Sequence, residues 1–225
     1  MSLTPTAPSI SGADSARLAR LKAAQRKAGE ARFFYWDAHF RNDAVKVLPG
    51  EYFVHDEDLL ITTTLGSCIA ACLWDRQARV GGMNHFMLPD GGGQAGDSAG
   101  SAGRYGGYAM ELLINELQKR GATRATLEAK VFGGGAVIGG MSSLNVGERN
   151  TSFVLNYLQA ERIPVISQDV MDIYPRKVCF LPASGKAMVK RLAPTHGIEL
   201  VAQERAAAQH SVTATGSVSG SVDLF

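Results

Sequence analysis

Short apolar stretches, each bounded by turn-forming residues, recur along the middle of the chain. Runs of this kind are typical of β-strands. The pattern predicts eight strands, at residues 44–48, 59–64, 69–74, 80–88, 124–131, 163–169, 177–181 and 187–190. Most of them are separated by only a few polar residues, which favours hairpins over long crossovers.

Two segments between these strands have the 3.6-residue apolar period of a helix. The first passes through Tyr108 and ends at Gly121, and the second runs from about residue 147 to residue 162. Two helices inserted among many strands favour an α+β fold. We therefore expect a layered, mixed or antiparallel β core with two main helices.

The two ends of the chain differ in composition from the middle. We expect an N-terminal extension at residues 1–43, a domain at residues 44–202 and a flexible tail at residues 203–225. Residues 1–13 are rich in Ser, Thr and Pro and are expected to be disordered.

A helix-favouring stretch follows within the extension, with Asp14 as a candidate N-cap and Gly29 as a stop. Leu18 and Leu21 form its thin apolar stripe. This stripe leaves open a solvated helix or a helix that docks on a partner.

Composition excludes several classes of protein. The longest apolar run has seven residues, 68–74, whereas a membrane-spanning helix needs about 20. The first 16 residues contain no apolar segment typical of a secretory signal. We expect a cytoplasmic protein with no direct membrane insertion. The net charge is +2, but the first 30 residues carry +3, from five basic and two acidic residues, and the rest of the chain carries −1. The domain itself therefore has no basic face for a nucleic acid.

Glycine is concentrated at two places, because 16 of the 25 glycines lie in residues 81–107 and 133–147. We expect residues 91–107 to form a mobile rim and residues 133–140 to form a wall. The sequence FGGGAVIGG within the second stretch lacks the Gly-Lys-Ser/Thr ending of a P-loop. A phosphate or nucleotide site there is therefore disfavoured.

The three cysteines cannot all pair within one chain, so at least one thiol stays reduced or pairs between molecules. Cys179 lies in an alternating strand and is expected to be a core residue. Cys68 and Cys72 have a C-x3-C spacing with no second pair of metal ligands, so no metal site is expected. Cys68 follows a Gly-Ser turn between two strands, where a thiol can be held for chemistry. A buried structural cysteine is the alternative.

A break at residues 75–78, which begins with three polar residues, separates two apolar strands and predicts a hairpin. With its centre between Arg76 and Gln77, Cys68 lies directly opposite His85. Side chains in such a pair are about 4.5–5.5 Å apart at Cβ. An imidazole at this place can accept the thiol proton, which permits nucleophilic acyl transfer. The imidazole needs a third group to orient it, and Thr62 on the preceding strand is one candidate.

Several motifs resemble those of the chemoreceptor glutamine deamidases, the CheD family. They cover about residues 51–191 and occur in the order expected of that family. The motifs are TTTLGSCIAACLWD, VGGMNHFMLP, RYGGYAMELLI, LEAKVFGGGA, NVGERN and PRKV.

The resemblance implies that Cys68 is the nucleophile, His85 its base and Thr62 the third residue, six positions before the cysteine. It implies an amidohydrolase that converts receptor glutamine to glutamate without cofactor or metal. It also implies a fold like the catalytic domain of cytotoxic necrotizing factor toxins. The expected partners are the cytoplasmic helical region of methyl-accepting chemotaxis proteins and a CheC-type phosphatase. Receptor glutamyl methylesterase activity, or a binding module without turnover, are the alternatives.

Two motifs leave questions open. The residues before PRKV read DVMDIY, where some members have glycines. The block that contains Asn145, Arg149 and Asn150 is expected to cap and open the second helix, although Arg149 and Asn150 can instead shape the substrate groove.

Overall fold

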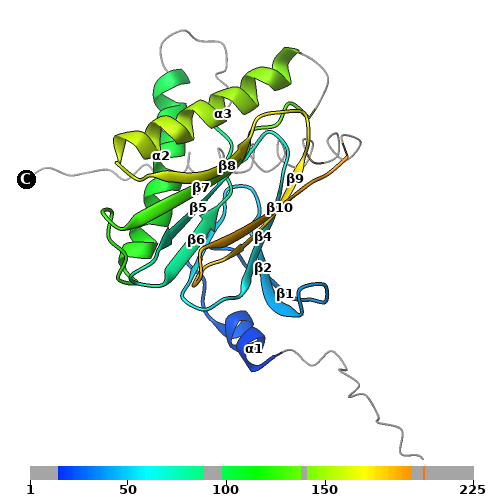
Figure 1. Ribbon diagram of the computed structural model, residues 1–225, viewed down its shortest axis with the longest axis vertical. Helices are drawn as coiled ribbons and strands as arrows, with labels where there is room; N and C mark the ends of the chain where they lie inside the picture. Colours follow the sequence, from blue (N-terminus) through cyan, green and yellow to red (C-terminus); the bar gives the residue numbers. More distant parts are fainter. Residues whose placement is uncertain (1–14, 89–97, 138–140, 194–199, 201–225) are drawn as a thin grey trace, which may run out of the picture.

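The computed structural model describes residues 15–88, 98–137, 141–193 and 200 of the 225-residue chain. The side chains of residues 98–104 and 141–145 are not described. Within these residues, ten strands form two five-stranded sheets, accompanied by three helices (Figure 1). The expected disordered start at residues 1–13, the C-terminal tail and residues 91–97 of the expected glycine-rich rim lie outside the described residues, whereas residues 98–107 of that rim belong to a helix.

The strands of each sheet come from separate parts of the chain. In spatial order, the first sheet contains β3 (Tyr52–His55), β6 (Val80–Asn84), β5 (Ile69–Asp75), β7 (Leu127–Gly133) and β8 (Val165–Val170). The second contains β1 (Phe33–Asp37), β2 (Asn42–Lys46), β4 (Leu60–Leu65), β9 (Arg176–Leu181) and β10 (Lys186–Arg191). Only β7–β8 and β2–β4 are parallel among these neighbours. The expected α+β fold with mixed sheets is confirmed.

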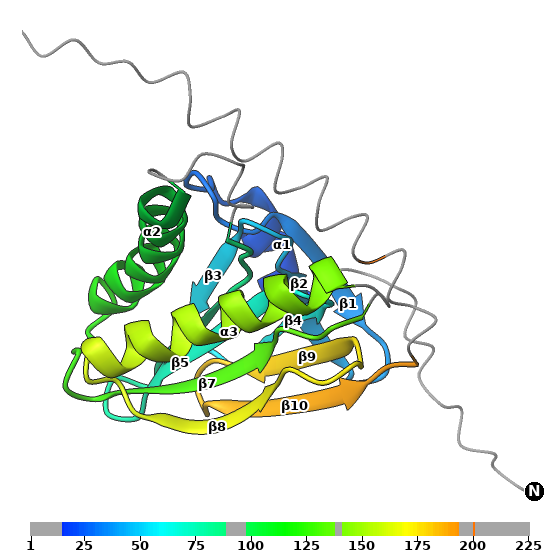
Figure 2. The ribbon, with the colours of Figure 1, turned by 90° about the horizontal axis from the view of Figure 1, so that it is seen from above.

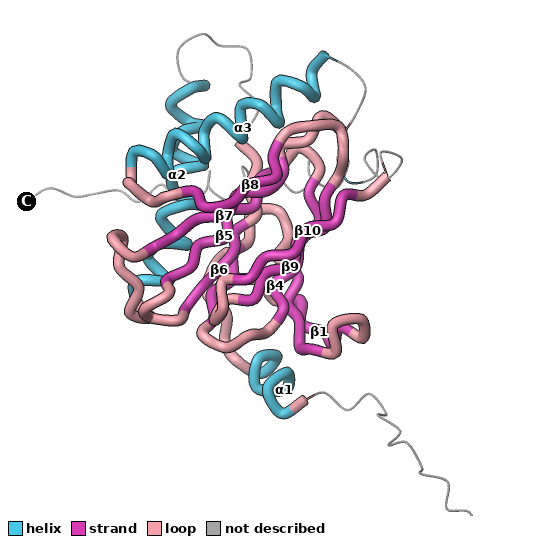
Figure 3. Tube along the Cα trace, viewed as in Figure 1, coloured by secondary structure: helices cyan, strands magenta, loops and turns pink. Residues whose placement is uncertain are grey.

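The molecule is layered. Helices α2 (Ser98–Gln118) and α3 (Met141–Ala160) cover one face of the first sheet, and the second sheet lies against its other face (Figures 1 and 2). One apolar cluster fills the space between the helices and the first sheet, and another fills the space between the two sheets. Helix α1 (Ala16–Ala23) lies at the far end, against β1 (Figure 3).

Strand β5 is buried on both faces, which explains the longest apolar run in the sequence. Ile69 and Leu73 belong to the cluster beneath the helices. Ala70 and Cys72 belong to the cluster between the sheets. Successive side chains of a strand point to opposite faces, so a strand between two cores has apolar residues at every position.

Two strands were not expected from the sequence, β1 and β3. Strand β1 leaves Phe33 and Trp36 58% and 45% exposed, so its apolar pattern does not mark a buried face. Strand β3 has only four residues. Because β1 pairs with β2, the sheet reaches N-terminally beyond residue 44.

Strand β6 ends at Asn84, earlier than the run 80–88 suggests. The Asn84 side-chain oxygen accepts a hydrogen bond from the backbone N–H of Ala71 at 3.0 Å, which replaces a bond of the ladder. The two strands meet again at an isolated bridge between Ile69 and Phe86.

Helix α3 begins at Met141, about six residues before the expected start. Residues 145–150 therefore lie inside the helix, and the expectation that they cap it is wrong. The expected start near Gly147 differs from the observed one because a glycine inside a helix weakens the helix without ending it. Packing against the first sheet stabilises this helix.

Helix α1 ends at Ala23, well before Gly29, and its N-cap is Ser15, whose hydroxyl accepts the N–H of Leu18. Leu18 and Leu21 are both buried in the cluster between the sheets. The helix is neither solvated all round nor left for a partner, because its apolar stripe docks on the sheets of its own chain.

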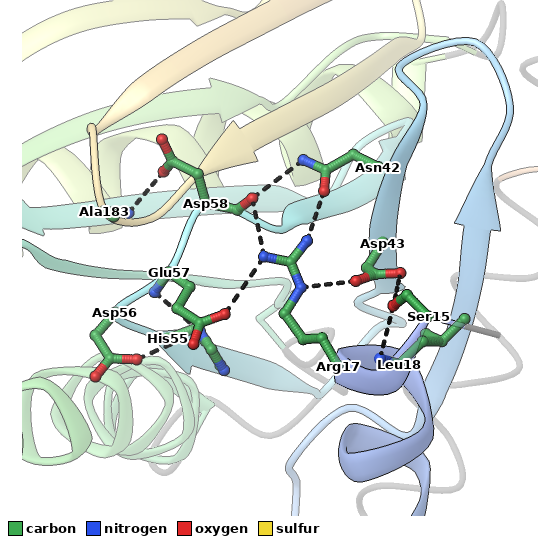
Figure 4. A network of polar contacts seen from close by, with 10 residues as sticks. All are labelled: Ser15, Arg17, Leu18, Asn42, Asp43, His55, Asp56, Glu57, Asp58 and Ala183. Atoms are coloured by element: carbon green, nitrogen blue, oxygen red, sulfur yellow. Dashed lines mark hydrogen bonds and ion pairs between the residues drawn. The ribbon is translucent and has the colours of Figure 1, made fainter.

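Polar contacts of Arg17 fix helix α1 to the second sheet (Figure 4). The guanidinium donates to Asp43 at 2.7 Å and to the Asn42 side chain at 2.7 Å, both on β2. The hydroxyl of Ser15 donates to the same Asp43 carboxylate at 2.6 Å. The backbone carbonyl of Asp58 also accepts from Arg17, at 3.5 Å, while the Asp58 carboxylate accepts the backbone N–H of Ala183 at 3.0 Å.

Candidate active site

Cys68 lies in the turn between β4 and β5, as the sequence predicts. We call residues 66–68 the Cys68 turn. The thiol is fully buried, at 0% exposure, and none of the three cysteines forms a disulfide. Its neighbour Ile69 exchanges two backbone hydrogen bonds of 2.9 Å with Phe86, so the start of β5 is held against the segment that carries His85.

The hairpin register differs from the expected one. Asp75 pairs with Val80, and Cys72 with Met83, so the centre lies one position later than expected. Extended to the Ile69–Phe86 bridge, this register places Met87 rather than His85 opposite Cys68. The direct pairing of Cys68 with His85 was therefore a wrong prediction.

The turn geometry explains the change. The Asp75 carboxylate accepts the backbone N–H groups of Gln77 and Ala78, at 2.8 and 3.0 Å. Arg79 then adopts a left-handed φ of 52° and closes a four-residue loop. The partner of Cys68 moves by two residues, and a two-residue shift preserves the face of the strand. His85 is a diagonal neighbour of Cys68, with both residues on the face toward the second sheet.

His85 is 2% exposed, and its Nδ1 lies beside two oxygens. Thr63 Oγ1 is 2.8 Å away and the Val47 carbonyl oxygen is 3.4 Å away. The Thr63 hydroxyl itself donates to that carbonyl at 2.7 Å. A carbonyl can only accept, and the hydroxyl has used its hydrogen, so the proton belongs on Nδ1. This tautomer gives Nε2 the basic lone pair.

Thr62 lies on the other face of β4. Its Oγ1 is 3.0 Å from the Tyr35 hydroxyl and donates to the Val45 carbonyl at 3.3 Å. Side chains alternate along a strand, so Thr63 points between the sheets with Ile61, while Thr62 points outward with Leu60. The structure thus brings together His85 and Thr63, and it places Thr62 beside Tyr35. Thr62 as the third residue stays a prediction.

The other two thiols are poorly suited to nucleophilic attack. Burial raises the pKa of Cys72 far above its ordinary value, and the charge of Lys130 opposes this only in part. Burial also raises the pKa of Cys179. The thiolate is the reactive form of cysteine, so these two positions favour a structural role.

A glycine segment, residues 133–136, supports the Cys68 turn from β7. The N–H of Gly134 donates to the Cys68 carbonyl, and the N–H of Gly135 donates to the Gly66 carbonyl, both at 2.8 Å. A Cβ on Gly133, whose φ is 112°, would lie 2.1 Å from the Cys68 carbonyl oxygen. These glycines allow the two backbones to touch; of the wall expected at residues 133–140, residues 138–140 lie outside the described part of the chain, and the wall stays a prediction.

Helix α3 supports the same turn through Asn150, which the sequence left undecided. Its amide nitrogen donates to the Ser67 carbonyl at 2.9 Å, and its oxygen accepts the N–H of Leu88 at 3.0 Å. Asn150 therefore links the Cys68 turn to the segment after His85. Gly147 lies one helical turn before Asn150, where a Cβ would be 2.4 Å from the Gly134 oxygen. The three-residue spacing from Gly147 to Asn150 was the available signal for this contact face.

Two further features concern the molecule outside this site. A cavity of about 410 Å³ lies between the end of α1 and β1. Its walls are formed by Lys22, Ala24, Gln25, Arg26, Arg32 and Phe34, and they include neither Cys68 nor His85.

Among the described residues, no helix has the length and apolar character needed to cross a membrane.

Comparisons with known proteins point to one family. A family model described as CheD chemotactic sensory transduction matches residues 87–191. The probable chemoreceptor glutamine deamidase CheD 1 of Albidiferax ferrireducens is 61% identical over 216 residues, which cover 96% of this chain and 90% of that protein. The probable chemoreceptor glutamine deamidase CheD of Janthinobacterium sp. is 53% identical, over 85% of this chain and 93% of that protein.

Among solved structures, the Bacillus licheniformis hypothetical protein YfiH overlaps in part with this chain. The match has a TM-score of 0.35 and 13% identity, and it covers 54% of this chain and 51% of that one. An overlap of this extent does not define a common fold.

Proposed function

The chain belongs to the CheD family of chemoreceptor glutamine deamidases, and we propose that it deamidates receptor glutamines through a thioester on Cys68. The observation that carries this mechanism is the environment of His85. Thr63 and the Val47 carbonyl hold its Nδ1 proton, so Nε2 is the basic nitrogen. Nε2 belongs to a side chain on the same face as the Cys68 thiol, and it can accept the thiol proton.

The reaction proceeds in two halves. In the first, His85 Nε2 takes the proton of Cys68, and the thiolate attacks the carboxamide carbon of the glutamine. The carbon–nitrogen bond then breaks, the imidazolium gives its proton to the leaving nitrogen, and ammonia departs. In the second half, water loses a proton to His85 and attacks the thioester. The carbon–sulfur bond breaks, which restores the thiol and leaves glutamate.

The supporting residues have separate tasks in this scheme. Asn150 and the glycine segment hold the backbone of the Cys68 turn. Thr63 orients the imidazole, while Thr62 is the residue that the family resemblance carries to this task. Since the thiol is fully buried, the groups that cover Cys68 must part before a glutamine side chain can reach it.

The proposal extends to partners and fold. The substrate is a glutamine on the cytoplasmic helical region of a methyl-accepting chemotaxis protein, and a CheC-type phosphatase is a further binding partner. The family resemblance supports both, as it supports a fold like the catalytic domain of cytotoxic necrotizing factor toxins. Superposition of an experimental structure on that domain tests the last point.

Receptor mass is the direct test of the activity. A receptor cytoplasmic fragment incubated with the protein should gain about one dalton for each glutamine converted, since OH replaces NH₂. Cys68→Ala should abolish the gain, whereas Cys179→Ala should retain it. Activity in Cys68→Ala would refute the assigned nucleophile. Binding without any change of mass would instead indicate a binding module, and loss of methyl groups from a methylated receptor would indicate esterase activity.

A further inference from the structure

The turn between β8 and β9, residues 171–174, is strained and exposes an apolar side chain. Met171 and Asp172 have φ values of 64° and 66°, in the left-handed region that costs about 1–2 kcal/mol for a residue with a side chain. Ile173, next along the turn, is 51% exposed. A strained conformation persists only where the surrounding structure holds it.

Arg176 holds both ends of this β8–β9 turn. Its side chain is 0% exposed. One guanidinium nitrogen donates to the Met171 carbonyl at 2.6 Å, and another donates to the Tyr174 carbonyl at 2.9 Å. Its Nε donates to Asp169 at 3.0 Å, which pairs the buried charge. The planar, buried guanidinium thus holds the two ends of the turn in a fixed position relative to each other.

The glycine segment connects the β8–β9 turn to the Cys68 turn. On the side of the β8–β9 turn, Met171 N–H donates to the Gly133 carbonyl at 2.8 Å, and Ala136 N–H donates to the Asp172 carbonyl at 2.7 Å. Gly135 lies between the two turns. A Cβ on it would be 3.1 Å from the carbonyl oxygens of Gly66 and Tyr174 alike.

Arg176 also pairs directly with Leu65 in the β4–β9 ladder, one residue before the Cys68 turn. Two connections, through the glycine segment and through the Leu65–Arg176 pair, therefore place the β8–β9 turn next to the Cys68 turn. The turn crosses from the first sheet to the second at this end of the molecule (Figure 1).

We propose that Ile173 is a specificity-determining residue, which packs against an apolar side chain of the receptor beside the glutamine held at Cys68. This inference rests on the proposed function, since it names the surface next to that thiol. An exposed isoleucine on a rigid turn offers apolar contact without an entropic cost of ordering a loop. The contact selects glutamines that have an apolar neighbour on the same side of the receptor segment.

The test compares Ile173→Ser with Ile166→Ser. Ile166 lies on β8 and is exposed to a similar degree, at 49%, so it is a matched control. Steady-state deamidation of the receptor fragment should show KM raised about tenfold in Ile173→Ser, with kcat changed by less than about twofold. Ile166→Ser should match the wild type in both constants. A KM for Ile173→Ser within about twofold of the wild type overturns the inference.

A binding measurement separates this inference from the proposed function. Titration of the fragment into Cys68→Ala and into Cys68→Ala with Ile173→Ser gives two Kd values, and the second should be about tenfold weaker. If the wild type leaves the receptor mass unchanged but this difference in Kd is found, the proposed function fails and the Ile173 contact stands. Equal Kd values, or no binding by either protein, overturn the contact.

Discussion

The Thr62–Thr64 run shows how much depends on a single position of a strand. Three identical residues follow one another, yet they have different surroundings, because alternate side chains point to opposite faces. Thr63 reaches Nδ1 of His85 between the sheets, and Thr62 reaches the Tyr35 hydroxyl outside them. Composition cannot distinguish the three. The family resemblance favours Thr62 as the residue that orients His85, whereas the hydrogen bond to Nδ1 favours Thr63.

Paired variants decide between the two threonines. Thr63→Val removes the hydroxyl at His85, and losing one such hydrogen bond costs about 1–2 kcal/mol. We expect kcat for receptor deamidation to fall about 5- to 30-fold. Thr63→Ser keeps the hydroxyl and should retain most activity, and Thr62→Val should stay within about twofold of the wild type. The reverse pattern would make Thr62 the third residue.

At the scale of elements, close backbone contact determines how the Cys68 turn is built. Strand β7 ends in glycines that lie against the turn, and α3 approaches the same glycines through Gly147. The Cys68 turn, β7 and α3 therefore meet through close backbone contacts at these glycines. This arrangement holds the thiol in one place, and it makes particular glycines irreplaceable.

Three glycine-to-alanine variants separate the causes. Gly133→Ala combines a φ of 112° with a Cβ 2.1 Å from the Cys68 oxygen, so unfolding free energy should fall by roughly 3 kcal/mol, with loss of activity. Gly121→Ala has a φ of 94° but open space around it, which isolates the backbone strain at about 1–2 kcal/mol. Gly107→Ala, inside α2, has neither cost and should stabilise by about 0.5–1 kcal/mol. Urea unfolding measures all three, and an equally mild effect at Gly133 would contradict the close contact.

For the whole molecule, the N-terminal region contributes to the folded unit. Leu18 is fully buried, and Arg17 joins α1 to β2. Further along, Lys27 forms an ion pair with Glu116 of α2. The N-terminal region therefore contacts both the second sheet and a helix that covers the first sheet.

Shortening Leu18 tests whether α1 is part of the fold. Leu18→Ala removes a buried side chain and should lower the unfolding free energy by about 2–4 kcal/mol. Arg20→Ala, at an exposed position of the same helix, should change it by less than about 0.5 kcal/mol. Denaturation midpoints with an unchanged slope would report both values. A loss below about 1 kcal/mol for Leu18→Ala would show that α1 does not dock in solution.

The Glu116 cluster predicts a pH dependence of stability. Burial alone would raise the pKa of Glu116, but hydrogen bonds and charge from Lys119 and Lys27 outweigh it and hold the pKa below its ordinary value. A lowered pKa in the folded state stabilises the protein above the unfolded pKa of about 4.3, and this stabilisation is lost as pH falls through the folded value.

Glu116→Gln should therefore be less stable than the wild type by about 1–2 kcal/mol at pH 7, and the difference should shrink below about pH 4. Urea unfolding at pH 7 and at about pH 3.5 measures it. Glu148→Gln, exposed on α3, serves as the control. A difference for Glu116→Gln that is the same at both pH values would contradict the role of this charge.

The sequence alone determined the features that depend on neighbouring residues in the chain. Apolar stretches and turn residues gave eight of the ten described strands and the period of the two long helices. The motifs around Cys68 and His85 gave the family. These signals are local, because strand and helix periods follow from the backbone and a motif is read within a few residues.

Only the tertiary structure decided which of these residues meet. The Asp75 turn set the register that makes His85 a diagonal neighbour of Cys68, and the stacking of the second sheet on the first presented Thr63 to the imidazole. Asn150 donates to the Ser67 carbonyl, 83 positions earlier in the chain, and Arg176 pairs with Leu65 in the β4–β9 ladder. Contacts between distant segments depend on how the two sheets pack, which is a property of the whole chain, and on a strand register that a one-residue change in a turn alters.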